Sequence, residues 1–211
     1  MLLNRRFAAV IVAALILVIG SGSAASAAPS ARDTTFVQEA HRSNLAGIAA
    51  GRLAQQKGRS DEVKALGARI IADHTRLDDA LGQVAANLGI ELPEVDAERR
   101  ATARRLEAAT GAEFDALFVA TQLEAHRVMV RLGETQLAEG SDAAVRKLAA
   151  DAAPVLAAHQ DAIRRAGRAL GVPTSVDGGT GGTAAPRSDR TTGLLMIAVG
   201  GLVALLGAGY L

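Results

Sequence analysis

The sequence predicts an all-α protein built around a four-helix bundle. Apolar residues recur at intervals of three and four along four long segments, and glycine and proline lie between those segments. Apolar residues make up 49% of the chain and aromatic residues only 2%, a composition that favours closely packed helices over a sheet. The chain has no Cys, which excludes thiol catalysis, zinc–thiolate sites, iron–sulfur clusters and c-type haem.

Residues 1–27 have the pattern of a secretory signal peptide. Arg5 and Arg6 precede the apolar run Phe7–Ile19, and Ala25-Ser26-Ala27 is an A-x-A-like cleavage site. An uncleaved membrane anchor is the alternative. Cleavage would remove two of the 23 basic residues and none of the 22 acidic ones, which leaves a nearly neutral protein. Near-neutrality and the scarcity of aromatic residues argue against a nucleic-acid partner.

The apolar, uncharged segment Leu194–Leu211 predicts a C-terminal transmembrane helix. A Gly-, Pro- and Ser-rich linker over 172–193 separates it from the helical domain, expected at 34–171. A cell-wall sorting signal is the alternative, although the basic tail of such signals is missing. This organisation predicts an exported protein, anchored in the cell membrane with its domain on the extracytoplasmic side.

The first two long helices are expected at Thr35–Lys57 and Asp61–Leu88, joined by a short turn. Thr34 is the expected N-cap of the first helix and Ser60 that of the second. The second helix carries apolar residues spaced by threes and fours: Val63, Leu66, Ile70, Leu77, Leu81, Val84 and Leu88. Such a stripe is typical of a helix that packs in a bundle.

The second pair of long helices follows a longer connection. A short helical segment over 94–108 is expected to cross over to the third long helix, at 110–139. Thr110-Gly111-Ala112-Glu113 has the sequence of a capping box and is expected to start that helix. The fourth helix is expected at 141–170, and Pro154 within it is expected to kink the helix or to remove one backbone hydrogen bond.

Each long helix carries one histidine within its apolar register: His41, His74, His126 and His159. Their side chains are therefore expected to point into the core or to its edge. When the helical rise is counted from Gly58, His41 and His74 lie within about 2 Å of the same height. Counted from Gly140, His126 and His159 differ in height by about 7.5 Å.

Buried imidazoles that face one another suggest a transition-metal or b-type haem site, because neutral histidine is a common metal ligand. The candidate ligands are His74, His126, His159, His41 and Asp73, and the candidate metals are copper, zinc and iron. The alternative is four separate polar side chains, each hydrogen-bonded to a neighbour.

The di-iron chemistry of ferritin-like bundles is not expected. Such sites use Glu-x-x-His, and the residues three before each histidine here are Gln38, Ile71, Leu123 and Leu156. No constellation for nucleophilic catalysis is present either.

Several motifs stand in register over about 34–170, among them Ile71-Ala72-Asp73-His74 and Gly111-Ala112-Glu113-Phe114-Asp115. With these motifs the chain resembles a bacterial exported family, domain of unknown function 4142, which is grouped with ferritin-like bundles. The resemblance implies a bundle in the cell envelope and brings no established activity. His74, His126 and His159 match recurring family positions, and His41 does not. Gly47 and Ala125 stand where relatives often carry a carboxylate, which argues against iron oxidation.

The first functional hypothesis is a non-enzymatic, membrane-tethered bundle that acts as an envelope or stress-associated binding module. Its predicted partner is the membrane, reached through the C-terminal helix, and no protein partner is predicted. The second hypothesis is a metal- or haem-binding bundle that uses the inward-facing histidines. A bundle oxidase is the third.

Overall fold

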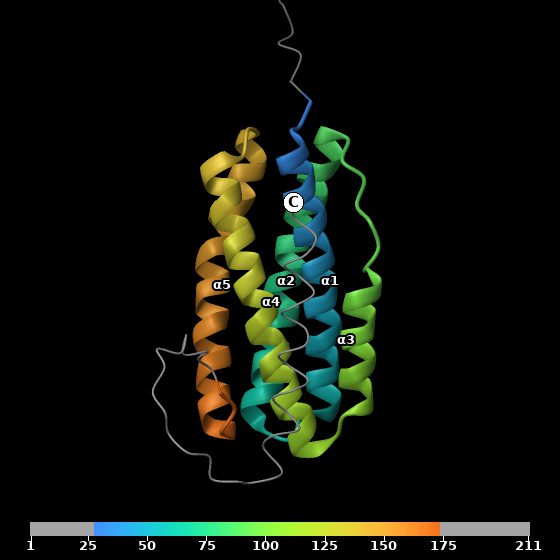
Figure 1. Ribbon diagram of the computed structural model, residues 1–211, viewed down its shortest axis with the longest axis vertical. Coiled ribbons are helices and arrows are strands. Elements are labelled where there is room, and N and C mark those ends of the chain that lie inside the picture. The colour runs from blue at the N-terminus through green and yellow to red at the C-terminus, as the bar shows by residue number, and fades with distance from the viewer. Residues whose placement is uncertain (1–27, 174–211) are drawn as a thin grey trace, which may run out of the picture. The chain divides into compact units, whose positions relative to one another are not determined.

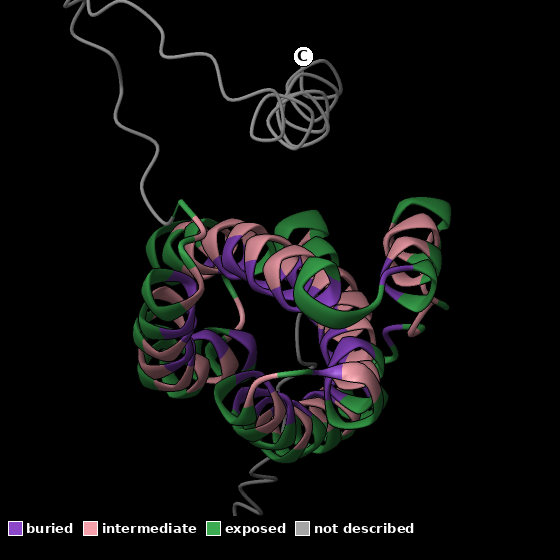
Figure 2. Cartoon of the chain, turned by 90° about the horizontal axis from the view of Figure 1, so that it is seen from below, coloured by how far each residue is buried: buried purple, intermediate pink, exposed green. Residues whose placement is uncertain are grey.

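The computed structural model describes residues 28–173, which form five α-helices and no strand (Figure 1). The helices are α1 (Ala31–Lys57), α2 (Asp61–Leu88), α3 (Ala97–Ala108), α4 (Gly111–Glu139) and α5 (Ala143–Leu170). Four long helices lie side by side as a bundle, and the short α3 packs outside it against α1 (Figure 1). Buried residues face the interior of the bundle (Figure 2). The all-α prediction and the short crossover helix are confirmed.

The predicted signal peptide (1–27), nearly all of the linker and the segment Leu194–Leu211 lie outside the described residues. Over residues 28–173, none of the helices has the length and apolar character needed to cross a membrane. This finding corrects the prediction of a membrane partner reached through a C-terminal helix.

The start of α1 and the cap of α4 differ from the sequence prediction. α1 begins after Ser30, not Thr34, because Ser30 and Asp33 form a capping box in which each side chain accepts a hydrogen bond from the other's backbone amide. At α4 the predicted capping box is absent, since the Thr110 side chain makes no capping hydrogen bond. Gly111 has a φ of +59°, so the backbone turns left-handed immediately after Thr110 and leaves the path that such a box requires.

Pro154 lies inside α5, where it is exposed to solvent, and the helix continues past it to Leu170. The missing proline amide costs one hydrogen bond on the outer face of the bundle and does not divide the helix.

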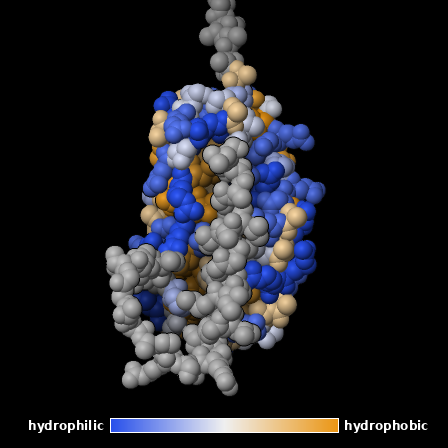
Figure 3. All heavy atoms as spheres, in the orientation of Figure 1, coloured by the Kyte–Doolittle hydropathy of each residue, from blue (hydrophilic) through white to orange (hydrophobic). Residues whose placement is uncertain are grey.

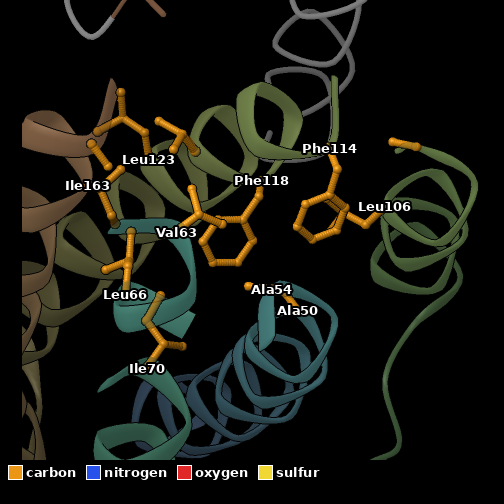
Figure 4. Packing of buried hydrophobic residues seen from close by; sticks show 13 residues of the cluster. Ala50, Ala54, Val63, Leu66, Ile70, Leu106, Phe114, Phe118, Leu123 and Ile163 are labelled. Atoms are coloured by element: carbon orange, nitrogen blue, oxygen red, sulfur yellow. The ribbon is translucent and has the colours of Figure 1, made fainter. Parts of the chain in front are cut away.

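The core has two apolar clusters, one towards each end of the bundle. The first joins Phe114 and Phe118 of α4 to Leu106 of α3, and residues of the other long helices surround them (Figure 4). The second includes Phe36, Leu81, Met129, Val145 and Leu156. His74 follows Ile70 of the first cluster and precedes Leu81 of the second along α2, so the histidines come at the level between the two clusters.

Two buried carboxylates tie the helical hairpins together in a reciprocal way. Asp33, near the start of α1, accepts hydrogen bonds from the amides of Ser141 and Asp142 in the α4–α5 turn, both at 3.2 Å. Asp115, near the start of α4, accepts hydrogen bonds from the amides of Arg59 and Ser60 in the α1–α2 turn, both at 2.9 Å. Each hairpin therefore uses a carboxylate to order the turn of the other.

This reciprocity reflects an internal repeat with an offset of 82 residues. The offset relates the carboxylates Asp33 and Asp115, and it also relates the N-caps Ser60 and Asp142. The left-handed C-caps Gly89 (φ 65°) and Gly171 (φ 67°) correspond in the same way. Since caps, turns and buried positions recur together, α1–α2 and α4–α5 are equivalent hairpins.

Replacing Asp33 with Ala is expected to lower the free energy of unfolding by about 1–3 kcal/mol, because a buried donor left without an acceptor costs this much. That donor is Gln136 Nε2, which lies 2.6 Å from the carboxylate. The amides of Ser141 and Asp142, which also donate to Asp33, are only partly buried. Urea unfolding of the purified protein measures the change. Asp79→Ala, at an exposed position of α2, is the matched control, with a change within about 0.5 kcal/mol. Equal stability of the two variants would contradict the role given to Asp33.

Candidate metal centre

Three of the four histidines meet in the centre of the bundle. His74 comes from α2, His126 from α4 and His159 from α5, and their side chains are 3%, 2% and 0% exposed. One ring nitrogen from each lies within 4.8 Å of the others. The ring centroids are 5.3–5.5 Å apart. Within residues 28–173, no Asp, Glu or further His joins this group.

The hydrogen bonds around His126 and His159 determine which ring nitrogens carry protons. His126 Nδ1 lies 2.8 Å from the Gln122 carbonyl oxygen, which can only accept, so Nδ1 donates. His159 Nε2 lies 2.9 Å from Asp73 Oδ2 and likewise donates, because an ionised carboxylate can only accept. In the neutral rings, the lone pairs are therefore on His126 Nε2 and His159 Nδ1.

These two lone-pair nitrogens face each other at 3.2 Å. Two acceptors at this distance repel unless a cation or a proton lies between them. Zinc–nitrogen bonds of about 2.0–2.1 Å at tetrahedral angles place two ligand nitrogens about 3.3 Å apart. The observed separation therefore suits two ligands of one metal ion.

A shared proton is disfavoured because burial lowers the pKa of both rings. Burial lowers the pKa of His126 to about 4, with an opposing effect from the Gln122 carbonyl and a further lowering by His159. Burial also lowers the pKa of His159, although its hydrogen bond to Asp73 and the charge of that carboxylate act in the other direction. Both rings are neutral near pH 7, the state in which imidazole binds metals.

His74 completes the group with two ring nitrogens that are buried and have no hydrogen-bond partner. Burial lowers the pKa of His74 to about 3, and the charges of His126 and His159 contribute in the same direction. A neutral imidazole has one donor and one acceptor, and leaving such groups unpaired in the core costs about 1–3 kcal/mol each. A metal ion would use the acceptor.

Asp73 lies beside the group and orients His159. Burial alone raises the pKa of Asp73, but the hydrogen bond and charge of His159 and the charges of Arg76 and Arg69 hold it below its usual value. Arg76 Nη2 is 2.8 Å and Arg69 Nε 3.6 Å from the carboxylate. An ionised carboxylate on the far nitrogen of a ligating histidine is a recurring arrangement in metal sites, because it fixes the ring and increases its basicity.

The structure does not bring His41 to the group. Its Nδ1 lies 2.8 Å from Asp78 Oδ1, and the Asn44 amide donates to the same oxygen at 3.3 Å. The pairing of His41 with Asp78, four residues beyond His74, shows that the sequence-based heights were wrong. His126 and His159, for which an offset was predicted, are instead in direct contact.

The error has one cause in both hairpins. The predicted heights take Gly58 and Gly140, the first residues of the turns, as the points where the chain reverses. The contacting pairs are centred about two residues later, near Ser60 and Asp142, because the rest of each turn also separates the helices. If the midpoint of a turn moves by two residues, the residue of the second helix that lies level with a given residue of the first moves by about four. Four residues correspond to ~6 Å of helical rise.

Gly47 is a further part of the site. A Cβ atom at Gly47 would lie 2.9 Å from His74 Nδ1, closer than real contacts allow, so glycine on α1 makes room for the ring. The sequence signal for this role is a glycine in the interior of a helix, which often marks a close packing contact. The contribution of the Gln122 carbonyl had no such signal, since every residue has a carbonyl group.

Fold and site together define the class: a helical bundle with three buried histidines gathered at its centre. The chain belongs to the family described as domain of unknown function (DUF4142), whose model matches residues 20–166. No curated protein and no solved structure matches the chain.

The metal-free protein is expected to lose stability as the pH falls from 7 to 5. The unfolded histidines have a pKa near 6.5, whereas His74 and His126 in the folded protein have values of about 3 and about 4. As the pH falls through 6.5 the unfolded chain therefore binds more protons, and each of these histidines costs up to about 1.4 kcal/mol per pH unit.

Urea unfolding at several pH values, in the presence of EDTA, measures this slope. His74→Leu removes the contribution of one histidine and should make the slope shallower by about 1 kcal/mol per pH unit, averaged over this range. A free energy of unfolding that is constant between pH 7 and 5 would refute the burial of neutral imidazoles.

Proposed function

We propose that the protein is a binding module for one divalent transition-metal ion, with His74, His126 and His159 as its ligands. The observation that carries the proposal is the pair of lone-pair nitrogens, His126 Nε2 and His159 Nδ1, held 3.2 Å apart in the core. Their outer nitrogens are engaged by Gln122 and Asp73, which leaves the inner ones for an ion. The signal-peptide pattern of residues 1–27 supports a location outside the cytoplasm.

The ligand type narrows the choice of metal. Imidazole suits zinc, copper, nickel and iron, whereas magnesium, calcium and manganese prefer carboxylate and carbonyl oxygens. The separation of 3.2 Å between the two facing nitrogens fits a tetrahedral ion with short metal–nitrogen bonds. Zinc meets both conditions and is the ion with which we test the proposal.

The alternatives from sequence fit less well. A haem held between His126 and His159 does not fit, because two nitrogens 3.2 Å apart leave no space for a macrocycle between them. Di-iron sites need carboxylate ligands. Within residues 28–173 the nearest candidate, Asp73, instead hydrogen-bonds His159.

Titration calorimetry of the metal-free protein with zinc tests the proposal, and elemental analysis after gel filtration gives the stoichiometry. One ion per chain is expected. His126→Ala should weaken binding by at least about 100-fold, since a three-ligand site becomes a two-ligand site. His41→Ala is the matched control, because it removes a histidine outside the group, and its affinity should stay within about threefold. Equal losses in both variants, or no zinc bound by the unaltered protein, would reject the proposal.

Asp73→Asn is expected to weaken zinc binding by roughly 10–100-fold while the stoichiometry remains one ion per chain, because removing an outer partner of a ligand has effects of this size. An affinity equal to that of the unaltered protein would show that Asp73 does not act through His159. Circular dichroism before titration confirms that the helices of the variant are intact.

A further inference from the structure

A cavity of about 270 Å³ lies between the four long helices and reaches His74. Its deep wall is apolar and includes Phe36, Leu81, Met129 and Leu156, which are buried. At its outer end lies Leu137, which is 42% exposed and is the single large apolar residue of 28–173 with high exposure. Figure 3 shows that hydrophobic side chains also reach the surface of the bundle between polar ones.

The internal repeat relates the lining of this cavity to the histidine group. The offset of 82 residues relates His74 to Leu156, His159 to Leu77 and His126 to Asn44. Leu156, Leu77 and Asn44 all line the cavity. The three histidines thus form the candidate metal site, whereas the residues at the equivalent positions of the repeat line the mostly apolar cavity.

The cavity has the character of a ligand site. Apolar cavities of about 150 Å³ already hold a molecule of the size of benzene, and this one is larger. Two buried polar side chains line it, Asn44 and His74. Asn44 donates to Asp78, whereas both ring nitrogens of His74 lack a partner. A polar group of a bound ligand is therefore expected at the end of the cavity that reaches His74.

We propose that the cavity binds a small amphiphile, with an apolar body and one carboxylate or phenolate group whose oxygen completes the coordination of the metal ion. This inference rests on the proposed function. Three neutral imidazoles leave a fourth coordination position open. They also leave the double positive charge of the ion uncompensated except by Asp73, and buried charge is costly unless it is paired. A carboxylate or phenolate bound to the metal would supply the missing negative charge, and the apolar part of the ligand would pack against the apolar wall of the cavity.

The test uses cobalt(II) as a coloured substitute for zinc and octanoate as the probe, with butanoate as the shorter comparison. Octanoate should change the visible spectrum of the cobalt-loaded protein, since a new oxygen ligand alters the ligand field. Its affinity should exceed that of butanoate on the order of 100-fold, because each buried methylene strengthens binding roughly fourfold. Its affinity for the metal-free protein should be at least about tenfold lower than for the loaded protein.

Two glycine variants provide a matched pair. Gly133 lines the cavity and Gly82 does not, and a Cβ atom at either position meets nothing within 4 Å, so both helices tolerate a larger side chain. Gly133→Leu should fill part of the cavity and weaken octanoate binding at least about tenfold, with cobalt binding retained. Gly82→Leu should change neither.

The outcomes separate this inference from the proposed function. A protein that binds no cobalt and no zinc overturns the proposed function. A protein that binds cobalt through His126 but shows no spectral change with octanoate, or equal octanoate affinity in the two glycine variants, overturns the amphiphile site alone. Equal affinity of the metal-free and loaded proteins for octanoate overturns the contact between its carboxylate and the metal.

Discussion

Three imidazoles packed at one level of a bundle core impose a cost that the rest of the structure has to offset. Neutral His74 leaves a donor and an acceptor unpaired, and the inner nitrogens of His126 and His159 face each other as two acceptors. Leucine occupies the equivalent of two of these positions in the repeated hairpin, at Leu156 and Leu77. An apolar core at this level is therefore compatible with the fold, so the histidines are best understood through the ion that their geometry suits.

The reciprocal carboxylates provide the rigidity that such a centre needs. Ligands must be held close to their bound positions before the ion arrives, otherwise part of the binding free energy is used to order them. Asp33 and Asp115 each secure the turn of the opposite hairpin, so the relative height of all four long helices is restrained at both ends.

The spacing of apolar residues, together with the glycine, proline and capping residues between the segments, was enough to predict the helices, their order and the inward direction of the histidines. These features depend on local spacing. The choice of three histidines out of four was not predictable in the same way. It depends on the residue at which each turn is centred. With an error of two residues in that position, the predicted neighbour of His41 on α2 is His74, whereas the observed neighbour is Asp78. The start of α1 is a different case, because Ser30 and Asp33 have the spacing of a local capping box. What local spacing cannot show is that Asp33 also pairs with Gln136 and Ser141, more than a hundred residues away along the chain.

In the proposed centre, the imidazole nitrogens of His74, His126 and His159 are the only ligands that the protein gives to the ion. X-ray absorption at the zinc edge of the loaded protein measures this directly. The account predicts three nitrogens at about 2.0 Å, the outer-shell scattering of imidazole rings, and one further light atom that completes a tetrahedral site. A first shell of five or six oxygens without imidazole scattering would contradict it, because the ion would then be bound by carboxylates elsewhere on the protein.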